Sequence, residues 1–280
     1  MKNKTLKKII IKTRRAVFSD IIGDNTTFLK GEGYDFVELR KYEVGEDVKK
    51  IDWTISAKMQ TPYVKVFHAQ RELNISIVSI LGGSVHFGTH KFKQELIAEI
   101  CAILGYSSIK QGDNFNSFIV NDSVNLSTKK SKKFFTVSLM LEKILNYNVL
   151  QKQVDYTVIT QKLFKMINKK SIIFLIGDFF DTSLLDLKIL SKKHEIIAII
   201  VRDKFEESPQ NLGNVNLIDP QTSQSFVGSM DRSLIKKYIK KVSLNDHHLY
   251  EHFQKCGIRF TKIYTSEEAI TKLMPLMSGK

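Results

Sequence analysis

Short apolar runs alternate with helix-patterned stretches from Leu73 to the end of the chain, and this alternation limits the fold more than any other feature. Each apolar run has the length of a strand, and each stretch between two runs repeats its apolar residues at helical spacing. Strands joined by helices require crossover connections, which produce a mainly parallel sheet with helices on both faces. The predicted strands are residues 73–81, 115–120, 172–176, 196–201, 215–218 and 258–263.

The intervening stretches predict helices of ordinary length. They comprise residues 92–104, 134–145, 160–167, 184–191, 231–256 and a short terminal helix after residue 263. Residues 73–280 are therefore expected to form one α/β domain of the Rossmann type. In a parallel sheet, binding sites form at the carboxyl ends of the strands, which directs attention to the loops after Leu81 and Ile176.

The first 72 residues lack this alternation. Residues 6–22 have the pattern of a basic amphipathic helix, which either docks on the α/β domain or lies on a membrane surface. Residues 23–70 are turn-rich and charged, and the alternating segment Tyr63–Phe67 predicts an edge strand. We expect residues 1–72 to form a basic helix and a small turn-rich β module in front of the α/β domain at 73–280.

The composition is strongly basic, which bears on the partners of the protein and on its location. A net charge of +14 favours acidic partners, which leaves nucleic acid, an anionic membrane surface and acidic proteins open. The positive charge is spread along the chain and is dominated by lysine, whereas bidentate recognition of phosphates and bases favours arginine. The apolar runs are too short to cross a bilayer, and the N-terminus lacks the apolar core of a secretory signal. We predict a cytoplasmic protein, with peripheral contact at the inner face of the membrane as an alternative.

The two cysteines, Cys101 and Cys256, lie in helix-patterned segments. Their number and spacing fit neither a disulfide framework nor a zinc site. We expect both of them to be small core residues in a reducing compartment.

A specific motif occupies the segment from Gly31 to Phe67, and it resembles a bacterial family called domain of unknown function fifty-eight. The residues in register with that family are Gly31, Gly33, Asp35, Phe36, Arg40, Tyr42, Gly45, Asp47, Ile51, Asp52, Trp53, Ala57, Val64, Lys65 and Glu72. The turn Gly177-Asp178-Phe179 and the segment Ile218-Asp219-Pro220 also resemble parts of the family, so the resemblance extends over nearly the whole chain.

The resemblance implies a von Willebrand A-like α/β domain. Proteins similar to this one are encoded beside a MoxR-type AAA+ ATPase and von Willebrand A proteins. The resemblance therefore implies an adaptor or scaffold without enzymatic activity in an ATPase-linked chaperone or assembly system, with the MoxR-type ATPase and von Willebrand A proteins as its partners.

The motif itself has two interpretations. Its two leading glycines allow a tight turn, Arg40 could form an ion pair with Asp47 or Asp52, and Trp53 is a large anchor that needs a partner. The cluster either joins the small module to the α/β domain or presents a recognition surface to the ATPase. The residues assigned to that surface are Gly31, Gly33, Arg40, Tyr42, Gly45, Asp47, Asp52, Trp53 and Lys65.

The resemblance also locates a metal site that looks degenerate. A von Willebrand A domain carries Asp-x-Ser-x-Ser after its first strand, and a threonine and an aspartate from later loops complete an oxygen site that suits Mg²⁺. Here Ile80 stands at the aspartate position, Gly82 replaces the first serine, and only Ser84 remains, with Asp178 in the later loop. We predict no cofactor at this position and keep Mg²⁺ as the disfavoured alternative.

Three functions are compatible with the sequence. The first is the adaptor for a MoxR-type ATPase, because no nucleophile–base pair or glycine-rich phosphate loop accompanies the carboxylates. The second is a metal-dependent adhesion-type binder of proteins, which needs the degenerate site to hold its ion. The third is a basic protein that binds nucleic acid or a membrane surface, which rests on the net charge alone.

Overall fold

The computed structural model describes residues 2–18, 36–67, 72–180, 182, 184–211 and 213–277. The chain divides into two compact units, one of residues 1–29 with 73–280 and the other of residues 30–72. The helix α1 (Lys2–Phe18) belongs to the larger unit, where it packs on α3 (Lys93–Lys110). The expected module at residues 1–72 is therefore corrected to residues 30–72. Of the two alternatives for the N-terminal helix, α1 takes the one in which it docks on the α/β domain.

A six-stranded sheet forms the centre of the larger unit. Its spatial order is β10-β7-β6-β3-β4-β5, which is 6-5-4-1-2-3 when its strands are counted along the chain. All neighbouring strands are parallel except β4 and β5 at one edge, and this is the Rossmann-type order. The strands are β3 (Asn74–Ile80), β4 (Asn114–Val120), β5 (Val124–Ser131), β6 (Ile172–Gly177), β7 (Glu195–Arg202) and β10 (Arg259–Tyr264). The predicted α/β fold class is confirmed.

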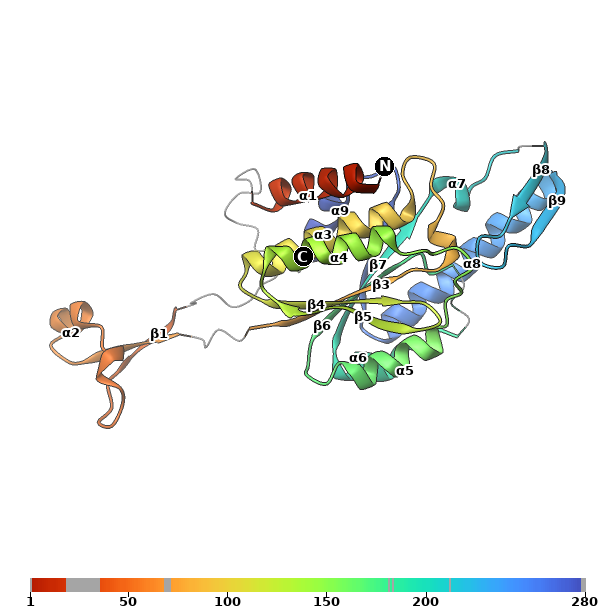
Figure 1. Ribbon diagram of the computed structural model, residues 1–280. Coiled ribbons are helices and arrows are strands. Elements are labelled where there is room, and N and C mark those ends of the chain that lie inside the picture. The colour runs from red at the N-terminus through yellow and green to blue at the C-terminus, as the bar shows by residue number, and fades with distance from the viewer. Residues whose placement is uncertain are drawn as a thin grey trace. The chain divides into compact units, whose positions relative to one another are not determined.

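Helices cover both faces of this sheet (Figure 1). The residues of α1, α3, α4 (Phe134–Asn146) and α9 (Ala269–Met277) build a core against one face. The residues of α5 (Tyr156–Met166), α6 (Lys188–Lys193) and α8 (Arg232–Lys255) build a second core against the other. Successive strand residues alternate between these cores, because side chains along a strand point to opposite faces. Among the described helices, none is both long enough and apolar enough to cross a membrane.

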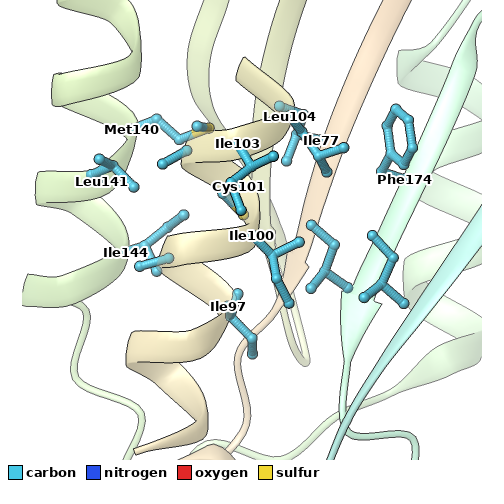
Figure 2. Close-up of a cluster of buried hydrophobic side chains, with 14 of the residues drawn as sticks. Ile77, Ile97, Ile100, Cys101, Ile103, Leu104, Met140, Leu141, Ile144 and Phe174 are labelled. Carbon is cyan, nitrogen blue, oxygen red and sulfur yellow. The ribbon is translucent and has the colours of Figure 1, made fainter. Parts of the chain in front are cut away.

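The helix α3 lies at the middle of the first core (Figure 2). It is buried around most of its circumference because α1 and α4 pack against the sides that the sheet leaves open. Cys101 is fully buried there, with its Sγ 3.2 Å from the Ser79 hydroxyl, and burial raises the pKa of its thiol to about 12. Cys101 is thus a core residue, as expected, whereas Cys256 is only partly buried.

A β-hairpin is inserted between β7 and α8. It consists of β8 (Gly213–Ile218) and β9 (Ser225–Met230), which pair with each other and with no strand of the large sheet. The short helix α7 (Lys204–Glu207) precedes it. Residues 215–218 were expected to be a strand of the main sheet, and that placement is wrong because their side chains are mostly exposed rather than covered on both faces.

The smaller unit is an antiparallel pair of strands with two short helices. β1 (Phe36–Lys41) pairs with β2 (Tyr63–Phe67), which confirms the predicted edge strand. The 3-10 helix η1 (Val48–Lys50) and the helix α2 (Trp53–Met59) lie between them. Val64 and Ile51 are buried and joined by a β-bridge, so they form the small apolar centre of this unit.

Candidate functional site

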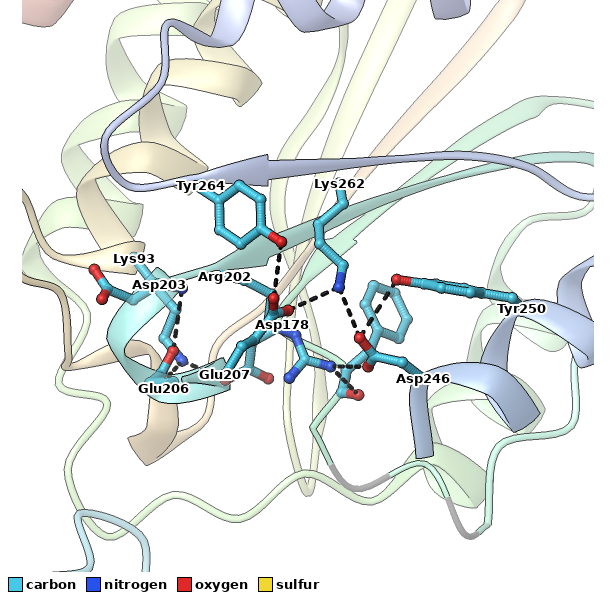
Figure 3. A network of polar contacts seen from close by, with 11 residues as sticks. Lys93, Asp178, Arg202, Asp203, Glu206, Glu207, Asp246, Tyr250, Lys262 and Tyr264 are labelled. Atoms are coloured by element: carbon cyan, nitrogen blue, oxygen red, sulfur yellow. Dashed lines mark hydrogen bonds and ion pairs between the residues drawn. The ribbon is translucent and has the colours of Figure 1, made fainter. Parts of the chain in front are cut away.

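The carboxyl ends of four parallel strands meet at one edge of the large sheet. β3 is followed by the 3-10 helix η2 (Gly83–Val85), β6 by Asp178, β7 by Asp203, and β10 by Thr265. These are the positions at which α/β sheets bind ligands. A dense set of buried charged side chains occupies this edge (Figure 3).

Lys93 is the central charge of the set. It is the first residue of α3 and its side chain is 0% exposed. Its Nζ lies 3.1 Å from Asp178 Oδ2 and 2.6 Å from Glu206 Oε1. The positive end of the α3 dipole opposes a cation at this position, and burial opposes any charge. The two carboxylates offset both effects, so the three side chains form one unit.

The two carboxylates around Lys93 differ in acidity. Burial alone would raise the pKa of Asp178, but the Lys93 ammonium, a hydrogen bond from Ser84 and the Arg202 guanidinium together lower it below its ordinary value. Burial raises the pKa of Glu206, and the negative charge of Asp178 raises it further, against the opposing effect of Lys93. Asp178 therefore carries the more firmly held negative charge, and Glu206 is the first of the two to accept a proton.

A second group of ion pairs continues from Arg202 across to β10. Arg202 Nη2 donates to Asp246 Oδ1 at 2.9 Å and to the Phe179 carbonyl at 3.1 Å. Lys262 Nζ donates to Asp246 Oδ2 and to Glu207 Oε1, each at 2.7 Å. These contacts hold α7, α8, β7 and β10 together at the sheet edge (Figure 3).

Asp203 connects several loops at the same sheet edge. Its carboxylate accepts hydrogen bonds from the backbone N–H and the hydroxyl of Thr89, and from the hydroxyl of Thr265. It also caps α7 by accepting from the Phe205 N–H at 2.9 Å. Burial would raise the pKa of Asp203, but these hydrogen bonds lower it below its ordinary value. The loops after β3, β7 and β10 are thereby joined through one side chain.

The residues at the expected metal position do not make a fitting set of ligands for Mg²⁺. Mg²⁺ requires several oxygen ligands in near-octahedral geometry. Ile80 is buried in the second core beside Gly177, where an added Cβ would lie 2.8 Å from the Ile80 Cβ. The Ser84 hydroxyl does contact the Asp178 carboxylate, as the resemblance implies. However, the Lys93 ammonium already lies between Asp178 and Glu206. A divalent ion would have to displace this lysine.

The β8–β9 hairpin covers the loop after β3. The Pro220 carbonyl at the hairpin tip accepts a hydrogen bond from the Gln151 N–H at 2.9 Å, and the Gln151 amide donates to the Ser223 hydroxyl at 3.1 Å. The tip approaches Gly83 so closely that an added Cβ there would lie 2.4 Å from the Pro220 carbonyl oxygen. Only glycine fits at residue 83 in this arrangement, and this part of the sheet edge is closed by the protein's own chain.

The motif residues of the smaller unit have local roles. Arg40 forms an ion pair with Glu46, a partner that the sequence analysis does not name, and the Tyr42 hydroxyl donates to the Glu46 carbonyl at 3.1 Å. Asp47 caps η1 through the Lys49 N–H, and Asp52 caps α2 through the Ile55 N–H.

The rest of the predicted motif is described only in part. Gly45 has φ of 111°, a conformation that favours glycine. Trp53 is the first residue of α2 and its side chain is 65% exposed. Lys65 lies in β2 opposite Leu39, while its side chain, together with Gly31 and Gly33, lies outside the described residues.

Sequence reasoning missed most of the network at the sheet edge. Of its members, Asp178 was singled out as a ligand position, but Lys93 lies in a helical stripe where a lysine is normally expected to face solvent. Arg202 ends a buried strand and Asp203 follows it, and this position is an available signal for a site residue. Asp203 and Glu206 resemble the family's Asp-Pro-x-Glu segment, but the sequence assigns them no role in a site. The side chains of the network that the sequence does not single out are Lys93, Arg202, Asp246 and Lys262.

Comparison with known proteins identifies relatives of this chain. The model of the family described as "Protein of unknown function DUF58" matches residues 38–248. Uncharacterized protein Rv1480 of Mycobacterium tuberculosis is 22% identical over 263 residues, covering 92% of this chain and 83% of the relative. Uncharacterized protein Mb1516 of Mycobacterium bovis shows the same identity and coverage.

Solved structures with a partial likeness include two bacterial proteins. The conserved hypothetical protein BatB from Bacteroides thetaiotaomicron aligns with a TM-score of 0.45 and 10% identity, over 74% of this chain and 100% of that chain. A von Willebrand factor type A protein from Catenulispora acidiphila aligns with a TM-score of 0.36 and 11% identity, over 48% of this chain and 34% of that chain.

Proposed function

The chain belongs to the family described as protein of unknown function DUF58, and from this premise we propose that it is a non-enzymatic adaptor that binds a partner protein without a metal ion. The partner that we propose is a MoxR-type AAA+ ATPase, because the Gly31–Trp53 motif resembles that of a family whose members are encoded beside such ATPases. We place this interaction in the cytoplasm. The α/β sheet of the larger unit is of the kind that von Willebrand A domains use for protein binding.

Lys93 is the observation that carries this proposal. Its ammonium lies between Asp178 and Glu206 at the sheet edge, where a metal-dependent binder of this fold would hold its ion. An internal cation supplies positive charge at that position but offers no open coordination site to a partner's carboxylate. The hairpin tip over Gly83 adds a steric barrier at the same edge. Both features support the proposal that the metal site of this fold is degenerate here.

The ion pairs within the network support a role other than catalysis. Lys93 and Lys262 each hold two carboxylates, and Asp203 accepts hydrogen bonds from two different loops. General acid–base catalysis needs a group that can reach a proton of the substrate. These buried groups are committed to one another, so we assign them the task of fixing the loops at the sheet edge.

The smaller unit supplies the surface that we assign to the ATPase. Several of its large apolar side chains are exposed, which is typical of sites for protein contact. Trp53 has the largest of these side chains, and tryptophan is enriched among residues that dominate binding energy. The exposed apolar residues of this unit are Leu39, Val44, Val48, Trp53 and Met59.

Capture of the ATPase tests this proposal. The purified protein is immobilised and presented with a purified MoxR-type ATPase from the same organism. We expect Trp53→Ala to weaken capture by at least about tenfold, since truncating a central anchor costs about 2 kcal/mol or more. Phe135→Ala is the matched control, because Phe135 is 73% exposed on α4 of the other unit. Capture that Trp53→Ala and Phe135→Ala weaken equally would contradict the assigned surface.

The variants also decide between the two interpretations of the motif. If Trp53→Ala lowers the melting temperature of the whole protein strongly, the motif acts as an internal connection rather than a recognition surface. Because the Trp53 side chain is largely exposed, we expect a change in the free energy of unfolding of less than about 1 kcal/mol. Absence of any capture by the wild-type protein would reject the adaptor role itself.

A further inference from the structure

An apolar groove of about 420 Å³ borders the charged network and shares only Glu206 with it. Four segments build it: the loop after η2, the helix α7, the β8–β9 hairpin and the first half of α8. The apolar side chains that line it include Phe87, Phe205, Leu217, Met230, Leu234 and Tyr238. We call this feature the α8 groove. Its volume is within the range of about 300–1,000 Å³ that binding pockets usually occupy.

The walls of the α8 groove are fixed by contacts already described. Glu206, which also lines the groove, is held by Lys93. The hairpin that contributes Leu217 and Met230 is fastened at its tip to Gln151, and Phe87 packs against Phe205 with ring centroids 6.3 Å apart. Leu234 and Tyr238 nevertheless remain exposed. The groove is thus a formed concave surface with apolar side chains open to solvent.

The border of the groove along α8 is strongly basic. The stretch from Arg232 to Leu244 contains five basic residues and no acidic residue. Lys237 and Lys241 follow Leu234 and Tyr238 by three residues, so each lies beside a groove residue on the helix surface. Both lysines are exposed, and among the described residues neither forms an ion pair. The border therefore carries a net positive charge, and Lys237 and Lys241 form no ion pair among the described residues.

The carboxylates nearest to the groove do not neutralise this border. Glu206 is paired with Lys93, and Glu207 is paired with Lys262 and accepts from the Tyr264 hydroxyl at 2.8 Å. Asp231 caps α8 and accepts from the Leu234 N–H at 2.7 Å, and this single carboxylate leaves the five basic residues of the border in excess. The groove therefore combines an apolar floor with an unbalanced positive edge. A ligand that complements it must bring large apolar side chains and negative charge together.

We infer that the α8 groove binds an acidic amphipathic segment of a partner protein. Large apolar side chains of the segment enter the groove, and its aspartates or glutamates face Lys237 and Lys241. This is the helix-in-groove or extended-segment mode of peptide recognition, with charge giving specificity. The inference rests on the proposed role in protein binding and locates a second contact surface, on the larger unit.

A membrane surface fits these observations less well than a protein segment. A basic helix on a lipid surface presents a continuous apolar face to a flat boundary. Here the apolar side chains of α8 form one wall of a concave site whose other walls come from α7, the hairpin and Phe87. The lysines of the border could contact the phosphates of a nucleic acid, but the apolar walls of the groove offer no polar partners to its bases or sugars.

Peptide selection tests the inference without a known partner. A phage library of random peptides is selected on the full-length protein, and an enriched peptide is labelled and titrated by fluorescence anisotropy. We expect the enriched peptides to be acidic, with large apolar residues at a spacing of three or four. Leu234→Asp should weaken binding by at least about tenfold, because burial of the apolar partner is lost. Leu244→Asp is the matched control, since Leu234 and Leu244 are 44% and 49% exposed on the same helix and Leu244 does not line the groove.

The charge requirement is tested by a second pair of variants. The double variant Lys237→Glu, Lys241→Glu should weaken binding of the enriched peptide by at least about tenfold. The control is Lys165→Glu, Lys169→Glu, which makes the same change of net charge at exposed positions away from the groove. Circular dichroism of each variant verifies that the fold is kept, and Leu234→Ser replaces Leu234→Asp if the latter does not fold.

Several results would overturn the inference. These are the enrichment of no peptide, the enrichment of basic peptides, or equal effects of the groove variants and their controls. Binding to phosphatidylserine vesicles that Leu234→Asp abolishes, without any peptide binding, would assign the surface to membranes instead. ATPase capture that survives Leu234→Asp while no peptide is enriched rejects the groove and leaves the proposed function intact. Enrichment of acidic peptides without any ATPase capture would support the groove and reject the proposed ATPase partner.

Discussion

At the scale of single residues, Lys93 explains the character of the sheet edge. A lysine that is completely buried at the first position of a helix opposes both solvation and the helix dipole. It is tolerated because Asp178 and Glu206, which lie 85 and 113 residues away in sequence, supply two carboxylates. The ammonium thereby holds together the start of α3, the loop after β6 and the helix α7.

Removing the Lys93 ammonium should therefore destabilise the fold strongly. Lys93→Met keeps the length of the side chain but leaves Asp178 and Glu206 facing each other without a cation. We expect the free energy of unfolding in urea to fall by about 3–5 kcal/mol. Lys255→Met is the control, because Lys255 forms an exposed pair with Glu251, and pairs of that kind contribute less than about 1 kcal/mol. A loss of similar size in both variants would contradict the role of Lys93.

Asp178 should make stability depend on pH in a defined direction. Its pKa is lowered in the folded state, so the folded protein binds this proton less readily than the unfolded chain. The stabilisation is complete well above the unfolded pKa of about 3.9 and is lost as the pH falls through the lower folded pKa. Glu206, whose pKa is raised, works in the opposite direction.

The comparison of wild type with Asp178→Asn isolates this contribution. The variant should be less stable at pH 7, because Lys93 then keeps only one carboxylate. The difference in the free energy of unfolding should shrink as the pH is lowered below about 4. Urea titrations at a series of pH values measure it. A difference that stays constant down to pH 3 would show that Asp178 acts only through packing.

At the scale of elements, the sequence predicts what depends on local pattern. The apolar strands at 172–176 and 196–201 and the long helix at 231–256 occur close to their expected bounds. The sequence does not predict the edge strand β5, because most of its residues are polar and its buried residues do not alternate regularly with exposed ones. The place of β8 was misjudged because a short strand pattern does not tell which partner it pairs with.

The same limit applies to the candidate site. The sequence locates the loops after β3 and β6, and the pair Ser84 and Asp178 does meet there. The buried network depends on side chains from α3, α7, α8 and β10, which the fold brings together from distant parts of the chain. A charged residue in a helix is normally solvated, so no local pattern marks Lys93 or Asp246 as buried.

The hairpin gives a test at the level of elements. Gly83→Ala places a methyl group against the Pro220 carbonyl, so the hairpin tip must move. We expect a loss of about 1–3 kcal/mol in the free energy of unfolding, typical of overpacking. Hydrogen exchange should become faster in residues 213–230 relative to β3 and β6. Unchanged exchange in the hairpin would show that its tip does not depend on contact with Gly83.

At the scale of the whole molecule, two compact units carry different parts of the proposed function. The smaller unit exposes Trp53 and other apolar side chains. The larger unit has a Rossmann-type sheet whose carboxyl edge is filled by Lys93 and covered in part by the hairpin. Under the proposed function, a partner binds to the exposed apolar side chains of the smaller unit and to the α8 groove of the larger unit, and this binding needs no metal ion.

The response to Mg²⁺ tests the central claim most directly. Thermal unfolding of the wild-type protein is recorded in EDTA and in millimolar Mg²⁺, with sodium chloride added to equalise ionic strength. A ligand that binds the folded state raises the melting temperature. Because the Lys93 ammonium already stands between Asp178 and Glu206, we predict the same melting temperature in both buffers. A rise of several degrees in Mg²⁺ would contradict the account, because it would show that the sheet edge holds a divalent ion.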